Sequence, residues 1–210
     1  MSEVTLLGLR PSTYVRTTQL VCANKGVSYT LEPVNFRSEE YLKDHPFRKM
    51  PVLKHGDVSL YETLAIATYL DEAFEGPALQ PSQPAHKARM LQWISVTSDY
   101  VYKSMVSGCV TERFVKPMRG LEPDEALIAA TVPVIERQLA VLNTALETAD
   151  FLAGPELTLA DLFLAPIVVY FAATPEGAAT LPNRPAVQSW LARMRETAEF
   201  QEINALGKPS

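Results

Sequence analysis

The sequence predicts a two-part fold, in which an α/β domain with a mixed four-stranded sheet is followed by an all-α helical bundle. Short strand-like runs alternate with helical patterns over the first part of the chain. A stretch rich in proline and polar residues then interrupts the pattern, and only helical patterns follow it. We therefore expect domains at 1–76 and 85–210, joined by a linker at 77–84.

The first domain should follow the order β-α-β, a short helix, then β-β-α. Apolar or alternating runs predict strands at 4–9, 27–36, 52–55 and 58–61. A helical pattern from Tyr14 ends at Gly26, and another runs from Glu62 to Phe74. The β-α-β unit implies a parallel pair, whereas the last two strands form a hairpin, so the sheet should be mixed.

Four helical patterns fill the second domain, at about 85–112, 123–148, 158–173 and 184–203. The clearest local signal is the segment "ELTLADLFLAPI". Thr158 suits the N-cap of a helix there, and Asp161 stands at the third helical position, where its side chain can return a hydrogen bond. Pro166 should kink the same helix.

Composition limits the classes of partner. The hydrophobic content is 47%, the charged content 20% and the net charge -5, which argues against a general nucleic-acid or anionic-membrane binder. The first residues do not resemble a signal peptide, so we expect a cytoplasmic protein with no membrane partner. Two cysteines are too few for a disulfide framework, and the three histidines share no metal-ligand spacing. We expect no metal and assign no role to the histidines.

Pro51 lies inside the strand-like run from Met50 to Leu53, although a proline cannot donate to a strand ladder. A cis peptide bond ahead of Pro51 would turn the chain and leave the N–H and C=O of Met50 facing outward. Those groups could dock an extended peptide by strand addition. The alternative is a proline at an edge strand or a bulge.

Glu62 and Thr63 stand at the start of a helix, one hairpin later. Unpaired N–H groups and the positive end of the helix dipole suit a carboxylate, and a threonine hydroxyl adds a donor. Glu62 could meet an ammonium group beside that carboxylate. The pair therefore matches the head of an amino acid, with ordinary helix capping as the alternative.

Ser12 falls at the carboxyl end of the first strand and the start of the first helix, where open α/β sheets place ligands. A hydroxyl at a helix start can donate to a thiolate and so favour it over the thiol. Lowering a thiol pKa by about two units requires roughly 2.7 kcal/mol, which one or two charge-assisted hydrogen bonds can supply. A plain N-cap is the alternative.

These segments, in this order, resemble the cytosolic glutathione transferase family. "PFRKMPVL" is similar to the family's "NPFGQIPAL"-type segment, and "LYETLAIATYLDE" to its helix start. "LTLADLFLAP" and "PNRPAVQSWLARM" are similar to segments of its helical domain. The resemblance covers nearly the whole chain and implies a thioredoxin-like first domain. "PSTYVR" looks closest to the serine types, such as the phi and theta classes, and we expect a bacterial member.

The resemblance implies that Ser12 activates the thiol of glutathione, with Tyr14 also able to approach it. Met50 would pair its backbone with the cysteinyl unit ahead of cis-Pro51. The implied glutathione-binding residues are Lys49, Met50, Pro51, Glu62 and Thr63. Threonine replaces the usual serine at position 63, which keeps the hydroxyl and adds a methyl group.

The electrophile is expected between the two domains, against the long helix that starts the second domain. Helical spacing puts Tyr100, Ser104 and Ser107 near one face of that helix, and core packing is the alternative. Arg113 is a candidate for substrate charge, with a salt bridge as the alternative. The expected second-substrate residues are Tyr14, Tyr100, Tyr102, Met105 and Arg113. Cys22 and Cys109 are expected to be packing residues.

The resemblance implies an enzyme that conjugates glutathione to an electrophilic small molecule, in detoxification and as a homodimer. A second enzymatic interpretation uses glutathione as a regenerated cofactor, for isomerisation of a maleyl-type acid or for dehalogenation. A third is a non-catalytic binding or stress-response module on the same fold.

Overall fold

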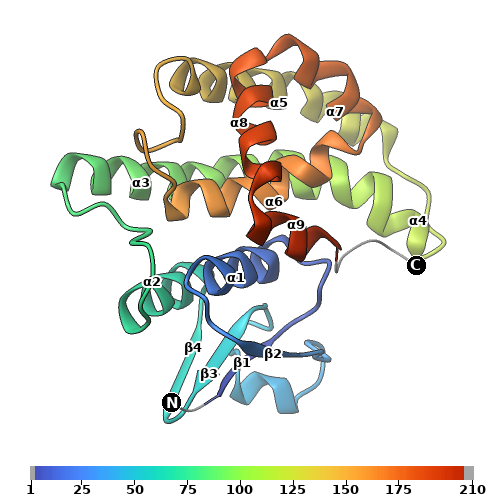
Figure 1. The fold of residues 1–210 in the computed structure, drawn as a ribbon. Helices are drawn as coiled ribbons and strands as arrows, with labels where there is room; N and C mark the ends of the chain where they lie inside the picture. Colours follow the sequence, from blue (N-terminus) through green and yellow to red (C-terminus); the bar gives the residue numbers. More distant parts are fainter. Residues whose placement is uncertain (1–2, 206–210) are drawn as a thin grey trace. The chain divides into compact units, whose positions relative to one another are not determined.

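A computed structural model describes residues 3–205 of the chain. The chain forms two compact units, and Figure 1 shows the elements of each. The second unit runs from Pro81 to Arg195, and the first comprises the chain up to Gln80 and again from Glu196. The sequence placed the segment after 195 with the helical domain, whereas the structure groups it with the sheet.

The sheet has four short strands in the order β2-β1-β3-β4. They are β1 (Val4–Leu7), β2 (Tyr29–Glu32), β3 (Val52–His55) and β4 (Val58–Tyr61). β1 pairs with β2 in parallel, and β3 pairs antiparallel with both β1 and β4. The predicted mixed sheet is therefore confirmed.

Helices pack on both faces of this sheet. They are α1 (Thr13–Asn24), the 3-10 helix η1 (Glu40–Lys43), α2 (Thr63–Ala73) and α9 (Ala198–Ala205). On one face, Leu7 and Val52 pack with Tyr41 of η1. Side chains alternate along a strand, so Leu6 and Leu53 point to the other face. There α1 and α2 lie side by side, and α9 packs on α1 (Figure 1).

A buried ion pair joins α1 to α2 and to the segment that leaves α2. The Lys25 ammonium lies 3.1 Å from an Asp71 carboxylate oxygen, and the two side chains are 3% and 5% exposed. Lys25 also donates to the carbonyls of Gly76 at 3.4 Å and Pro77 at 3.0 Å. Asp71 accepts from the Leu79 amide at 2.9 Å. Part of the expected linker is thereby fixed against the first unit.

The second unit is helical, as predicted. Its elements are α3 (Pro84–Val96), the π-helical stretch η2 (Thr97–Val115), α4 (Lys116–Met118), α5 (Glu125–Leu146), α6 (Leu159–Ala172), α7 (Pro175–Thr180), the 3-10 turn η3 (Leu181–Asn183) and α8 (Pro185–Glu196). In η2 the hydrogen bonds reach five residues back, as from the Lys116 N–H to the Thr111 carbonyl. The sequence did not predict α7, and the helix expected at 184–203 is two helices, α8 and α9, separated at Thr197.

Asp161 ties the start of α6 to α8 and to the segment before α6. Its carboxylate accepts from the Thr158 amide at 3.0 Å, from the Thr158 hydroxyl at 3.1 Å and from the Leu152 amide at 3.0 Å. The indole N–H of Trp190 donates to it at 3.0 Å. The expected hydrogen bond, in which the Asp161 side chain accepts from the backbone amide of the N-cap Thr158, is confirmed. η2 approaches α5 closely, because a Cβ on Gly108 would lie 2.8 Å from the Thr131 methyl group.

Within residues 3–205, no single helix combines the length and apolarity that a membrane span needs. α6 together with the segment Pro175–Asn183 meets the length and composition criteria only as a pair bent by 97°.

Candidate functional site

The strand register brings three segments to one edge of the sheet. Leu7, at the carboxyl end of β1, pairs with Val52 at the amino end of β3, and Val52 pairs with Tyr61 at the carboxyl end of β4. Adjacent strands lie about 4.8 Å apart, so this row of three residues spans about 10 Å. The segments that continue from it carry Ser12, Met50-Pro51 and Glu62-Thr63. The register therefore gathers the residues that the sequence singled out in the first domain.

Ser12 is the N-cap of α1, as its alternative interpretation predicted. Its hydroxyl oxygen accepts from the Val15 amide at 3.4 Å, and the residue is half-buried. This long hydrogen bond uses the oxygen as an acceptor and leaves the O–H available to donate. Capping and donation to a thiolate are therefore compatible roles for the same hydroxyl.

The start of α2 presents unpaired backbone donors. Glu62 occupies the N-cap position with φ 71°, in the left-handed region, and no side chain caps the helix. The first N–H groups of a helix have no intrahelical partner, so those of α2 are available to an anion. Thr63 is buried and Glu62 is exposed. In the described part of the chain, the Glu62 carboxylate forms no ion pair.

The loop that ends at Pro51 is held in place by side chains from the preceding segment. The Met50–Pro51 peptide bond is cis, the geometry that the sequence suggested. The Tyr41 hydroxyl donates to the Lys49 carbonyl at 2.8 Å. Arg48 has φ 53°, and its guanidinium contacts Arg37 and Glu39. No hydrogen bond of the Met50 backbone occurs among residues 3–205, so both of its polar groups are available.

His45, to which the sequence gave no role, lies between this loop and β4. Its ring is 1% exposed, with centroid distances of 5.0 Å to Tyr61, 6.3 Å to Phe47 and 6.5 Å to Tyr41. The Phe47 amide donates to its Nδ1 at 3.3 Å. A search for metal-ligand spacing misses such a residue. The signal that could have found it is the i, i+4 placement beside Tyr41, directly before the proline-containing loop.

The expected second-substrate residues differ in exposure. Tyr100 is 63% exposed, whereas Met105 is fully buried within the second unit. Ser104 is also buried, and its hydroxyl bonds to the Gln138 side chain on α5 at 2.5 Å. Ser104 therefore faces α5 and does not share the exposed face of Tyr100. The face of η2 that contacts α5 and α6 is the buried one. Tyr14 and Tyr102 are half-buried, and burial raises the pKa of Tyr102.

Arg113 has the structural role that its alternative interpretation predicted. Its guanidinium lies 2.5 Å from a Glu176 oxygen and 2.6 Å from a Glu125 oxygen. The hydrogen bonds that Arg113 donates to Glu176, and then to Glu125, raise the pKa of Arg113, and those to Glu176 lower the pKa of Glu176. The Cys109 thiol lies 3.4 Å from the same Glu176 carboxylate, and burial raises its pKa to about 11. The charge of Arg113 is thus neutralised within the second unit.

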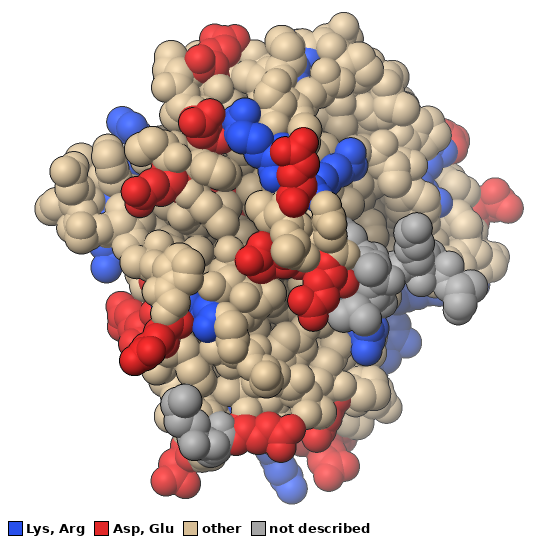
Figure 2. Space-filling model, viewed as in Figure 1, with Lys and Arg blue, Asp and Glu red and all other residues tan. Residues whose placement is uncertain are grey.

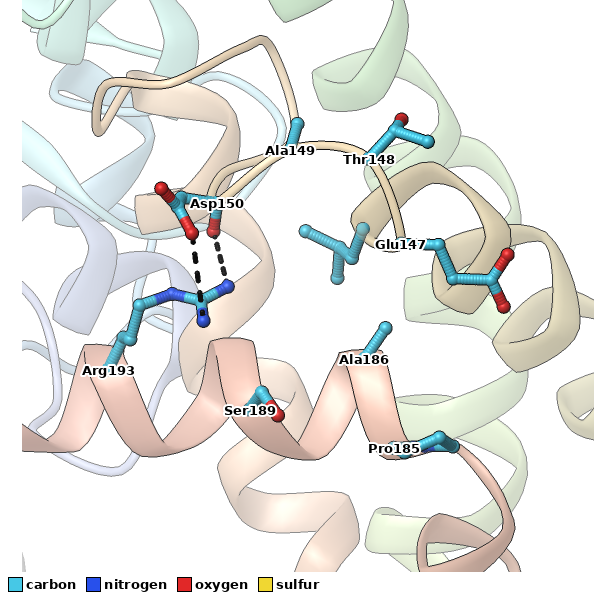
Figure 3. A pocket seen from close by; sticks show the side chains of 9 residues that line it. Glu147, Thr148, Ala149, Asp150, Pro185, Ala186, Ser189 and Arg193 are labelled. Carbon is cyan, nitrogen blue, oxygen red and sulfur yellow. Dashed lines mark hydrogen bonds and ion pairs between the residues drawn. The ribbon is translucent and has the colours of Figure 1, made fainter.

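A hollow of about 500 Å³ opens in the second unit between the end of α5 and α8 (Figure 3). Arg193 reaches from α8 to Asp150 and donates to its carbonyl at 2.8 Å. The hollow contains none of the residues that the sequence singled out. Figure 3 shows a wide opening rimmed by the loop at 147–150.

Comparison with known proteins shows to which family this architecture belongs. A family model described as the glutathione S-transferase N-terminal domain matches residues 6–78, and one for the C-terminal domain matches residues 109–193. A glutathione S-transferase of Hyoscyamus muticus is 30% identical over 175 residues, which cover 80% of this chain and 82% of that protein. The chain belongs to the glutathione S-transferase family.

Other relatives agree with this membership. Glutathione S-transferase 1 of Zea mays is 29% identical over 88% of each chain. The solved structure of glutathione S-transferase I from maize, in complex with an atrazine glutathione conjugate, has a TM-score of 0.90 at 26% identity and covers 100% of both chains. A theta class glutathione S-transferase from Xanthomonas axonopodis pv. citri, with glutathione bound, has a TM-score of 0.85 at 27% identity and covers 96% of this chain and 97% of that one. The predicted fold class and family are therefore confirmed, while the bacterial origin stays a prediction.

Proposed function

We propose that this glutathione S-transferase family member is a glutathione transferase, which conjugates glutathione through its thiolate to an electrophilic small molecule. The observation that carries the proposal is the single row Leu7, Val52 and Tyr61. From it project a hydroxyl donor, a free backbone edge and an uncapped helix start. These three groups match a thiolate, a peptide unit and an amino-acid carboxylate.

In the proposed binding mode, the N–H groups at Thr63 hold the γ-glutamyl carboxylate and Glu62 meets its ammonium group. Met50 pairs its N–H and C=O with the cysteinyl unit ahead of Pro51. Lys49 is exposed and can reach a carboxylate of the tripeptide. All of these contacts arise within the first unit.

The proposed chemistry is nucleophilic displacement or addition. Ser12 donates its hydroxyl proton in a hydrogen bond to the glutathione sulfur, which favours the thiolate over the thiol. The thiol proton passes to solvent, and the thiolate electron pair forms a bond to the electrophilic atom. In displacement, the leaving group departs with the electron pair of the bond that breaks. In addition, the displaced π-electron pair takes up a proton from solvent. No covalent bond to the enzyme forms, so the rate gain comes from thiolate stabilisation and orientation.

The decisive experiment compares wild type with Ser12→Ala in conjugation of 1-chloro-2,4-dinitrobenzene, with retention on a glutathione column measured in parallel. We expect the variant to be retained and to lose at least tenfold in kcat/KM, about 1.4 kcal/mol or more. Ser12→Thr keeps both the cap and the hydroxyl and should keep most activity. Equal activity of wild type and Ser12→Ala would remove Ser12 from the mechanism.

Ser12→Ala also removes an N-cap, which costs about 0.5–2 kcal/mol of stability. Asp124→Ala is the matched control, because Asp124 caps α5 by accepting from the Leu127 amide at 2.9 Å. It should lose a similar stability and retain activity. Absence of both column retention and activity in wild type would favour the non-catalytic interpretation.

No observation favours the isomerase or dehalogenase alternative. Three basic side chains could support it, those of Arg10, Arg16 and Arg113. Arg113 is paired with two carboxylates, and Arg16 donates from Nε to the Arg10 carbonyl at 3.2 Å. Figure 2 shows acidic and basic side chains interspersed on the visible face, without an extended basic surface.

The homodimer implied by the family resemblance is also proposed. We propose that the dimer interface covers Phe47, which is 66% exposed, and Val141 of α5, which is 60% exposed, since burial of exposed apolar surface favours association. Sedimentation equilibrium should give twice the chain mass of 23.2 kDa. The cytoplasmic location and the detoxification role stay predictions.

A further inference from the structure

His45 connects two of the three backbone segments that form the proposed glutathione site. Its buried ring packs on Tyr61, the last residue of β4, which is followed directly by Glu62. The same ring accepts from the Phe47 amide, in the loop that continues to Met50. A change in this one ring therefore acts on both segments.

The hydrogen bond from Phe47 fixes the tautomer of the neutral ring. Because Nδ1 accepts the amide proton, the ring proton of neutral His45 is on Nε2. An imidazolium ring carries a proton on each nitrogen and has no acceptor. Protonation would therefore break the bond to Phe47 and leave its amide N–H facing another donor.

The charged groups around the ring act in opposite directions. Burial is the largest effect and lowers the pKa of His45, Glu62 raises it, and Lys49 lowers it. Burial also raises the pKa of the neighbouring Tyr41 to about 12, so that phenol is neutral near pH 7. Asp44 precedes the ring and is paired with Lys54 of β3 at 2.7 Å. At neutral pH the ring is accordingly uncharged.

We propose that His45 is a positioning residue through which acid weakens glutathione binding: the neutral ring holds the Met50 loop, and the imidazolium releases that loop and competes for Glu62. This inference rests on the proposed function, because it assigns Met50 and Glu62 to the tripeptide. An imidazolium near Glu62 offers that carboxylate a positive charge in place of the ligand's ammonium group. Both effects lower affinity as pH falls, and neither requires the ring to touch the ligand.

Binding of S-methylglutathione, measured by calorimetry between pH 5.5 and 7.0, tests this inference without interference from thiol ionisation. Reference α-carboxyl and α-amino pKa values are about 3.3–3.7 and 7.7–8.0, so the ligand's main charges change little in this range. We expect wild-type Kd to rise several-fold on going from pH 7.0 to 5.5, and by no more than about eightfold, which is the limit for uptake of one proton by a group with a pKa below 6.5. Far-UV circular dichroism at both pH values checks that the protein stays folded.

Two variants separate positioning from a general effect of acid. His45→Asn keeps a side-chain oxygen that can accept from the Phe47 amide but does not titrate, so its Kd should change less than twofold over the same range. His86→Asn removes a histidine of the second unit and should retain the wild-type pH dependence. If His45→Asn shows the same pH dependence as wild type, the inference is wrong.

A direct readout follows from thermodynamic linkage. If S-methylglutathione binds the neutral ring preferentially, its binding must lower the pKa of His45 measured by the NMR titration of the ring C–H signals. An unchanged or raised pKa would contradict the inference. Failure of wild type to bind S-methylglutathione at pH 7.0 would instead contradict the proposed function itself.

Discussion

Replacing Asp71 by alanine should destabilise the first unit by about 4 kcal/mol. The change leaves the Lys25 ammonium, whose side chain is 3% exposed, without its counter-charge. Removal of one partner from a buried ion pair typically costs about 3–5 kcal/mol. The Leu79 amide also loses its acceptor, which alone costs about 1–3 kcal/mol. These two costs overlap, because the same local relaxation readmits water to both groups.

Two companion variants test the origin of this cost. Asp71→Asn keeps an oxygen for the Leu79 amide but removes the charge, so about 3 kcal/mol of the loss should remain. Lys54→Met breaks the more exposed pair with Asp44, whose side chains are 45% and 28% exposed, and should cost less than about 1 kcal/mol. The contrast isolates the effect of burial on an ion pair within one unit.

Urea unfolding gives the measurement, because the two units carry different probes. Both tryptophans, Trp93 and Trp190, lie in the second unit, whereas far-UV circular dichroism reports helices of both units. When unfolding is followed by circular dichroism, the transition of Asp71→Ala should occur at a lower urea concentration than that of wild type. A shift no larger than that of Lys54→Met would refute the reasoning, since it would mean that water reaches Lys25 at little cost.

Three further predictions concern the second unit and the thiols. Asp161→Ala removes the acceptor of four buried hydrogen bonds and should lower the free energy of unfolding by about 4 kcal/mol. Urea unfolding followed by tryptophan fluorescence measures this loss, and a value below about 1 kcal/mol would contradict the importance of these hydrogen bonds. Gly177→Ala places a Cβ onto the Phe171 carbonyl and should lower the thermal midpoint by several degrees, whereas an unchanged midpoint would show that α7 can move. Burial raises the pKa of Cys22 to about 12 and that of Cys109 to about 11, so about 0.1% or less of either is thiolate at pH 8. Neither should react with a disulfide reagent until urea is added, and rapid labelling of the native protein would rule out this burial.

The sheet edge could be predicted from the sequence because each of its parts has a local signal. Pro51 inside an apolar run, a hairpin turn, and a helix start at Glu62 are read from a few neighbouring residues. Their convergence follows once the strand order is known, because the register of β3 against β1 and β4 aligns the ends. The local signal of His45 is weaker, an i, i+4 placement beside Tyr41, since its proposed role depends on packing against Tyr61, 16 positions further along the chain.

The helical unit shows where local patterns fail. The spacing of Tyr100, Ser104 and Ser107 assumes regular α-helix, whereas η2 is π-helical and turns Ser104 toward α5. The break at Thr197 has no proline or glycine to mark it. Thr197 instead caps α9, because its hydroxyl oxygen accepts from the Phe200 amide at 3.3 Å, a threonine N-cap that the helical patterns of the sequence did not single out.

The return of the chain to the first unit after Arg195 sets the order in which a ribosome can complete the protein. α1 receives its covering helix α9 from a segment that is synthesised 115 residues after Gln80. At about 5–20 residues per second, roughly 6–23 s pass between these two points. During that interval the surface of α1 that α9 later covers stays bare on the nascent chain. The sheet and the edge proposed to bind glutathione can form early, but the first unit is finished last.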